Sequence, residues 1–164
     1  MARPPRKALT LVQQAGRLRA RYPDRPPPKV NATRLRWTTR IAPSPSSLTY
    51  LVQVLLHRST GLSVRVLDPV LELAPGHTHL PHVFPGDRLC LYYDEFDREV
   101  DLLADTVVPW ITEWLYFYES WLATGEWLGG GVEHDSDLRT RPRRTRRARL
   151  GSATEPRATG AVNA

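Results

Sequence analysis

This chain carries a single cysteine, two lysines and no apolar run long enough to span a membrane. The lone thiol, that of Cys90, excludes an internal disulfide, as is typical of proteins in a reducing cytosol. A membrane-spanning helix needs about 20 mostly apolar residues in a row. The basic first residues are not followed by an apolar segment of the length found in secretory signals. We therefore expect a cytoplasmic protein without a membrane partner.

Basic residues are mostly arginine, and they are unevenly distributed. The 21 arginines and two lysines are typical of a GC-rich genome, and the alternative is a protein that handles activated acyl groups and avoids amine acceptors. The net charge is +6, and residues 135–164 hold eight arginines against three acids. The rest of the chain is near neutral, so nucleic acid is not an expected partner. Few apolar residues beyond 134 predict a disordered tail over 135–164, and residues 1–7 a flexible N-terminus.

Apolar periodicity predicts two helices. Residues 8–22 place apolar side chains on one face, and a proline-rich linker follows them. Residues 101–124 repeat apolar side chains at helical spacing and end before a glycine stop. Pro109 fits this second helix only in its first turn, which requires a cap at Asp105 or Thr106. The second helix holds most of the tryptophan and tyrosine, so we expect it to pack on a sheet.

Three strands are predicted between the helices, over residues 34–41, 48–56 and 62–73. Short turns rich in serine, proline and glycine separate them, and Pro69 marks an edge or a bulge. Such spacing is typical of an antiparallel meander. The order of helix, meander, cysteine-bearing loop and long helix predicts an α+β fold with the long helix on one face of the sheet.

The sequence around Cys90 allows several interpretations. The thiol could be a small core hydrophobe, which is common for unpaired cysteine. With His77, His79 and His82 it could form a zinc site, because three imidazoles and a thiolate suit that metal. With one of these histidines it could act as the nucleophile of a hydrolase. The residue types alone leave these alternatives open.

A fourth interpretation comes from a resemblance. Residues 81–83, a turn at Gly86 and then residues 89–91 resemble the active-site signature of ubiquitin-conjugating (E2) enzymes: His-Pro-Asn-apolar, a glycine turn and apolar-Cys-Leu. His82 precedes Cys90 by eight residues, the place of the asparagine in that family. The order of the predicted elements is also similar. The chain departs from the signature in having leucine for its first histidine and histidine for its asparagine.

The run from residue 104 to residue 131 is similar to the stand-alone E2-like proteins of bacterial CBASS anti-phage operons. The resemblance implies an E2-like domain over residues 8–134 without the later helices of eukaryotic E2 enzymes. It implies a thioester on Cys90 with the C-terminus of a cGAS/DncV-like nucleotidyltransferase, or with a ubiquitin-like protein. That acyl group would pass to an amine and prime anti-phage signalling, with an E1-like activator as a further partner and no cofactor.

The resemblance also implies roles for residues near the thiol. His82 would donate a hydrogen bond to the oxyanion or brace the loop, and carboxylates after the cysteine would orient the incoming amine. The implied catalytic residues are Cys90, His82 and Asp94, and the implied substrate contacts are Pro81, Phe96 and Asp97. Two alternatives remain: a catalytically silent E2-like binding module, and a thiol or zinc hydrolase that uses Cys90 with His77, His79 and His82.

Overall fold

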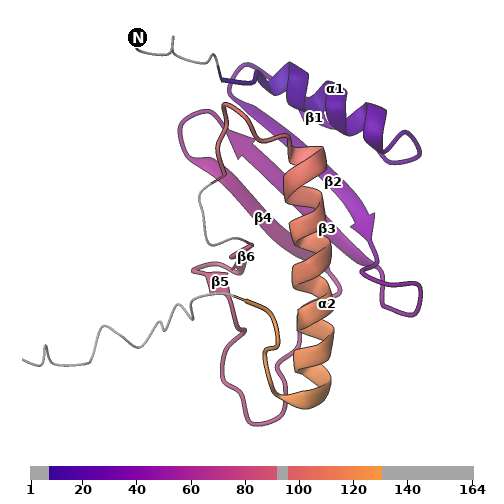
Figure 1. The fold of residues 1–164 in the computed structure, drawn as a ribbon. Helices are drawn as coiled ribbons and strands as arrows, with labels where there is room; N and C mark the ends of the chain where they lie inside the picture. Colours follow the sequence, from indigo (N-terminus) through magenta and orange to yellow (C-terminus); the bar gives the residue numbers. More distant parts are fainter. Residues whose placement is uncertain (1–7, 92–95, 131–164) are drawn as a thin grey trace, which may run out of the picture. The chain divides into compact units, whose positions relative to one another are not determined.

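A four-stranded antiparallel sheet is the centre of the structure, a computed structural model that describes residues 8–91 and 96–130. In chain order the elements are α1 (Leu11–Arg21), β1 (Lys29–Val30), β2 (Arg34–Ile41), β3 (Tyr50–His57), β4 (Gly61–Asp68), β5 (Val83–Phe84), β6 (Arg88–Leu89), the π-helical turn η1 (Leu103–Val107) and α2 (Val108–Thr124). The sheet order is β1-β2-β3-β4, while β5 and β6 form a separate hairpin. The predicted α+β fold is therefore confirmed (Figure 1).

Buried positions alternate along strands β2 and β3, with mostly exposed polar side chains between them on β2 and half-buried side chains between them on β3. Leu35, Trp37 and Ile41 of β2 are at most 4% exposed. Trp37 lies opposite Val54 of β3 in the antiparallel register, and Val54 is buried on the same side. We call this buried side the inner face of the sheet and the opposite side its outer face.

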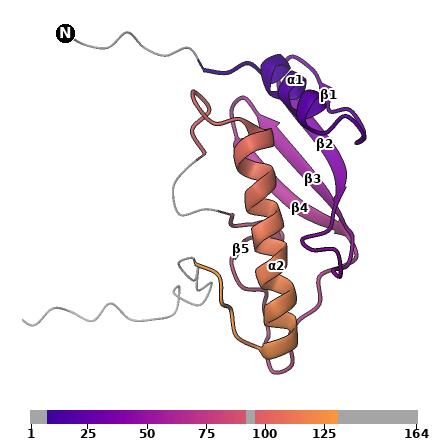
Figure 2. The ribbon, with the colours of Figure 1, turned by 45° about the vertical axis from the view of Figure 1, so that its right-hand side comes forward.

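Helix α2 covers the inner face (Figures 1 and 2) because its apolar side chains recur at helical spacing. Ile111, Leu115 and Tyr118 are fully buried beneath it. The ring of Tyr118 meets that of Tyr50 on β3 edge to face, with centroids 6.2 Å apart. The helix ends at Gly125, whose φ of 78° is left-handed and free of Cβ strain only in glycine. The predicted glycine stop is confirmed.

Helix α1 packs beside η1 and confirms the predicted N-terminal helix with narrower bounds. Thr10 and Gln13 form a capping box at its start. Gln14 is 1% exposed and joins the two elements. Its Nε2 donates to the carbonyl of Asp101, and its Oε1 accepts from the backbone N–H of Leu103, both at 2.8 Å. A buried amide therefore fixes how the chain enters η1.

The start of the second helix differs from the prediction. Helix α2 begins at Val108 with Pro109 in its first turn, as expected, but neither Asp105 nor Thr106 caps it. Both lie in the preceding π-helical turn. The carboxylate of Asp105 accepts hydrogen bonds of 2.8 and 3.2 Å from the guanidinium of Arg17 on α1. Because η1 already supplies carbonyl partners for the first turn of α2, no side-chain cap is needed.

The strand bounds also differ from the prediction. Strand β4 ends at Asp68, whereas the predicted strand continued to residue 73. It stops there because Pro69 has no N–H to donate to the next strand. Strand β3 starts at Tyr50, because the N–H of Leu48 donates to the carboxylate of Glu119 on α2 at 3.1 Å. The two-residue strand β1 was not predicted, since so short a segment has no visible alternation.

The predicted flexible N-terminus and arginine-rich tail lie outside the described residues, as do residues 92–95 of the acidic loop. Within the described part, no helix combines the length and the apolar character needed to cross a membrane.

Candidate active site

The cysteine segment forms the β5–β6 hairpin and the residues that leave it. Val83 pairs with Leu89 across the hairpin. Its turn holds Gly86 and Asp87 at φ values of 78° and 54°, and glycine and aspartate are among the residues that tolerate this region. The hairpin lies beside β4 and shares a cavity of about 150 Å³ with it. That cavity is lined by Leu62, Ser63, Val64, Phe84, Arg88, Leu89 and Leu91.

Cys90 follows β6 directly and is half-buried. The preceding Leu89 is 4% exposed and belongs to the core, whereas Cys90 does not. This difference disfavours the interpretation of Cys90 as a core hydrophobe. The backbone N–H of Cys90 donates to the carbonyl of His82 at 2.9 Å. The main chain is therefore held by a hydrogen bond at Cys90, while the residue as a whole is half-buried.

His82 braces the other side of the hairpin. Its carbonyl accepts from Cys90 and also from Nε1 of Trp114 on α2, at 3.2 Å. The residue is 6% exposed, and its ring centroid lies 4.9 Å from that of Trp127. Its φ of 49° is left-handed, which histidine adopts more readily than most side chains. His82 thus ties the hairpin to α2 through its backbone and to Trp127 through its ring.

Trp127 completes this arrangement after the chain reverses at Gly125. Its ring lies 5.6 Å from Trp114 and 6.0 Å from Phe117, both on α2. A Cβ added to Gly129 would lie 2.7 Å from a ring carbon of Phe117 and 2.8 Å from Nε1 of Trp127. The sequence did not predict a role for Trp114 or Trp127 at the site. The available signal was a tryptophan followed within two residues by glycine, beyond the end of the helix.

The other predicted site residues are only partly brought together. Pro81 is half-buried directly before His82, and Phe96 is half-buried and packs against the core. Asp97 is exposed, and its Oδ1 accepts the N–H of Glu99 at 2.8 Å within its own turn. Asp94 lies outside the described residues. The structure therefore groups Cys90, His82 and Pro81.

The turn that contains Asp97 is fixed by contacts elsewhere in the fold. The carbonyl of Arg98 accepts the N–H of Leu9 at 3.0 Å, next to the start of α1. The guanidinium of Arg98 donates to the carbonyl of Arg58 at 2.6 Å, in the turn between β3 and β4. These bonds hold residues 97–101 at the end of the sheet near α1.

The histidines proposed for a zinc site do not converge. Within residues 8–91 and 96–130, no three His, Cys, Asp or Glu side chains are grouped as metal ligands. His77 packs its ring against Trp121 with centroids 5.0 Å apart, and Nδ1 of His79 lies 3.1 Å from the hydroxyl of Thr78. The zinc hydrolase alternative therefore has no geometric support among the described residues.

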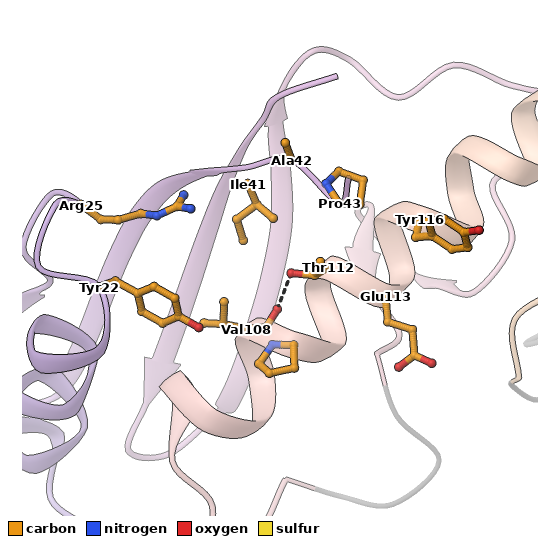
Figure 3. A pocket seen from close by; sticks show the side chains of 10 residues that line it. Tyr22, Arg25, Ile41, Ala42, Pro43, Val108, Thr112, Glu113 and Tyr116 are labelled. Atoms are coloured by element: carbon orange, nitrogen blue, oxygen red, sulfur yellow. Dashed lines mark hydrogen bonds between the residues drawn. The ribbon is translucent and has the colours of Figure 1, made fainter. Parts of the chain in front are cut away.

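A larger cavity of about 480 Å³ lies between α1, the end of β2 and the first half of α2 (Figure 3). It is lined by Tyr22, Arg25, Ile41, Ala42, Pro43, Val108, Pro109, Thr112, Glu113 and Tyr116. None of these residues belongs to the hairpin or to the tryptophan cluster around His82. This cavity is therefore separate from the cysteine site.

The comparisons with known proteins agree with this geometry. None of the curated proteins matches the chain. A family model described as "Type II CBASS E2 protein" matches residues 14–135, which is well over half of the chain. The matched range includes the whole sheet, the hairpin with Cys90, helix α2 and Trp127. The chain belongs to the family of type II CBASS E2 proteins.

Proposed function

We propose that this E2 protein carries an acyl group as a thioester on Cys90 and passes it to an amine. The observation that carries the proposal is the setting of the single cysteine. Cys90 is half-buried at the exit of a hairpin, and its backbone is fixed by His82. A nucleophile needs a fixed position and an approach for the acyl donor, and this setting supports both.

The chemistry needs two transfers. In the first, the Cys90 thiolate attacks the carbonyl carbon of an activated acyl donor, itself a thioester. The donor's C–S bond breaks, its thiolate leaves, and the acyl group remains on Cys90. In the second, an amine attacks the same carbon, the Cys90 thiolate leaves, and loss of a proton from nitrogen gives an amide. An ordinary thiol is a few per cent thiolate near pH 7, which is enough for this exchange.

The proposed donor is the C-terminus of a cGAS/DncV-like nucleotidyltransferase, delivered by an E1-like activator. Membership of the CBASS E2 family supports a partner within that system. The resemblance of the cysteine segment to the E2 signature supports a peptide carboxyl group as the cargo.

We assign His82 a positioning role. Its carbonyl is the acceptor that fixes the Cys90 backbone, and its ring is packed against Trp127. Burial to 6% exposure leaves this side chain little access to a bulky acyl substrate. The alternative role that the sequence suggested, an imidazole that donates a hydrogen bond to the oxyanion, remains a prediction. The second experiment distinguishes it from positioning.

The first experiment tests the thioester. A synthetic peptide with the C-terminal residues of the nucleotidyltransferase, activated as a small-molecule thioester, is mixed with the full-length protein. Intact mass spectrometry under non-reducing conditions should detect one peptide adduct, which dithiothreitol removes. Cys90→Ala should form none. A thiol-resistant adduct, or the same adduct on Cys90→Ala, contradicts the proposal. Unimpaired anti-phage activity of Cys90→Ala in cells would favour the silent binding module.

The second experiment separates the two roles of His82. His82→Asn restores an amide donor and tolerates a positive φ, whereas His82→Phe keeps an aromatic ring against Trp127 but removes every side-chain donor. If His82 positions the loop, His82→Phe should still discharge the Cys90 thioester to free lysine, with the pH profile of the unsubstituted protein. If the imidazole donates, only His82→Asn should retain discharge. Urea unfolding of both variants corrects each rate for the folded fraction.

A further inference from the structure

The outer face of the sheet is strongly basic. Residues directly opposite each other in an antiparallel pair point to the same face, so the register assigns every outward side chain. Lys29 of β1 pairs with Arg36 of β2, which pairs with Leu55 of β3. Alternation along β2 adds Arg34 and Arg40 to the same side. All four cations are exposed.

Strand β4 adds one charge of each sign to this face. Arg65 pairs with Gln53, and Asp68 pairs with Leu51. Both Gln53 and Leu51 alternate with the buried residues of β3 and so point outward. The outer face therefore presents five cations, Lys29, Arg34, Arg36, Arg40 and Arg65, against one carboxylate, Asp68.

Helix α2 differs in charge from the outer face of the sheet. Helix α2, which covers the inner face, contains Glu113 and Glu119 but no lysine or arginine. An arginine-rich composition would raise the number of cations on every surface and does not account for this separation. Helix α1 carries Arg17, Arg19 and Arg21, so the difference in charge is between the outer face of the sheet and α2.

Within the part of the chain that the structure describes, no cation of the outer face has a carboxylate ion-pair partner. Across residues 8–91 and 96–130, the one ion pair is that between Arg17 and Asp105, on α1 and η1. Alternate residues of a strand are about 7 Å apart, so β2 presents a row of guanidinium groups at this interval with one gap at Thr38. Unpaired charges arranged this regularly favour a partner with repeated negative charge.

The apolar and aromatic content of the face decides which polyanion fits. The outward apolar side chains of β2 and β3 are Leu51 and Leu55, which are half-buried and each lie opposite an arginine of β2, so they form no exposed apolar patch. A protein interface would need an apolar centre there. The outward positions of β2 and β3 also carry no Phe, Tyr or Trp, which single-stranded nucleic acid uses for base stacking. Contacts to a duplex backbone need neither feature.

We propose that the outer face of the sheet binds the phosphate backbone of double-stranded nucleic acid without sequence preference. The row on β2 and Lys29 supply the phosphate contacts. This site is distinct from the cysteine site and does not depend on the proposed acyl transfer. It also revises the expectation, drawn from net charge, that nucleic acid is not a partner.

The test measures binding of full-length protein to a fluorescent duplex of about 24 base pairs and arbitrary sequence, as DNA and as RNA, across a salt series. Each phosphate contact contributes about 0.9 to the slope of log affinity against log salt. The variant Arg34→Gln, Arg36→Gln, Arg40→Gln should lower that slope by roughly 2–3 and weaken binding at low salt by about tenfold or more. Urea unfolding verifies that the variant is folded.

The matched control removes the same charge from the C-terminal segment, with Arg143→Gln, Arg144→Gln and Arg146→Gln. A smaller effect of this control than of the β2 variant supports the proposal. Equal binding of the duplex by the β2 variant and the unsubstituted protein overturns the proposal. It is also overturned if duplex binding by the C-terminal control variant no longer depends on salt. Complete displacement of the duplex by polyglutamate at equal charge concentration would also overturn it, in favour of an acidic protein as the occupant.

Discussion

Gly129 shows how much of the site depends on one missing methyl group. A Cβ at this position would lie 2.7 Å from Phe117 and 2.8 Å from Trp127, closer than Cβ atoms are found in proteins. The backbone can approach both rings only because residue 129 is glycine. That approach keeps Trp127 against His82, whose carbonyl fixes Cys90.

Gly129→Ala should therefore displace Trp127 and slow thioester formation on Cys90 several-fold. The measurement is the rate of adduct formation with the activated peptide, alongside Trp fluorescence. Gly16→Ala is the matched control, because Gly16 is an exposed helical glycine with nothing within 4 Å of an added Cβ. It should stabilise the protein by about 0.5–1 kcal/mol and leave the rate unchanged. An unchanged rate in Gly129→Ala would show that the Trp127 contact is dispensable.

At the scale of elements, Gln14 holds α1 to the segment that leads into η1. Gln14→Ala leaves the carbonyl of Asp101 and the N–H of Leu103 without their partner in a poorly hydrated site. We expect a loss of roughly 2–3 kcal/mol in the free energy of unfolding, measured by urea denaturation. Gln13→Ala, on the exposed side of the same turn, removes the side-chain half of the capping box but keeps the bond from the backbone N–H of residue 13 to Thr10, and should cost about 1 kcal/mol or less. Equal losses in both variants would contradict this assignment.

The ion pair between α1 and η1 predicts a pH dependence of stability. The Arg17 guanidinium lowers the pKa of Asp105 through their hydrogen bond, against a smaller opposing effect of burial. A lowered folded pKa adds stability above the ordinary aspartate value of 3.8, and this stability is lost as pH falls through the folded pKa. Asp105→Asn should therefore lower the urea midpoint near neutral pH, and the difference should disappear as the pH falls below the lowered pKa of Asp105.

Because both side chains are partly exposed, salt should weaken the same effect. A stability difference that persists in strong acid or at about 1 M salt would mean that Asp105 acts by packing rather than by charge. Arg17→Gln should reproduce the pH dependence of Asp105→Asn, since either change removes the same pair.

The elements with strong internal patterns could be predicted from sequence. Alternation in β2 predicted both of its ends, helical periodicity predicted α2 and its end at Thr124 but not its start, and the segment around Cys90 resembled the E2 signature. The π-helical turn and the Gln14 bridge could not be predicted, because they depend on contacts between residues almost 90 positions apart. The packing of Trp127 on His82 likewise depends on how the chain reverses after α2.

On the scale of the whole molecule, net charge does not describe any single surface, because it averages over all of them. The alternation of Arg34, Arg36 and Arg40 with buried residues was visible in the sequence. What was missing was the register that adds Lys29 and Arg65 to the same face, together with the absence of cations from α2.

The two proposed activities lie on different parts of the fold and should be independent. Neighbouring strands are about 4.8 Å apart, so β2 lies roughly 10 Å from β4, and the Cys90 hairpin lies beside β4. Substitutions this far apart without shared partners usually act additively. Cys90→Ala should therefore bind duplex like the unsubstituted protein, and the β2 triple variant should form the thioester at the unsubstituted rate. Arg65 is kept out of that variant because its guanidinium approaches Gly86 in the hairpin turn. Inhibition of adduct formation by saturating duplex, absent in the β2 variant, would instead show that bound nucleic acid reaches across β4 and covers the thiol.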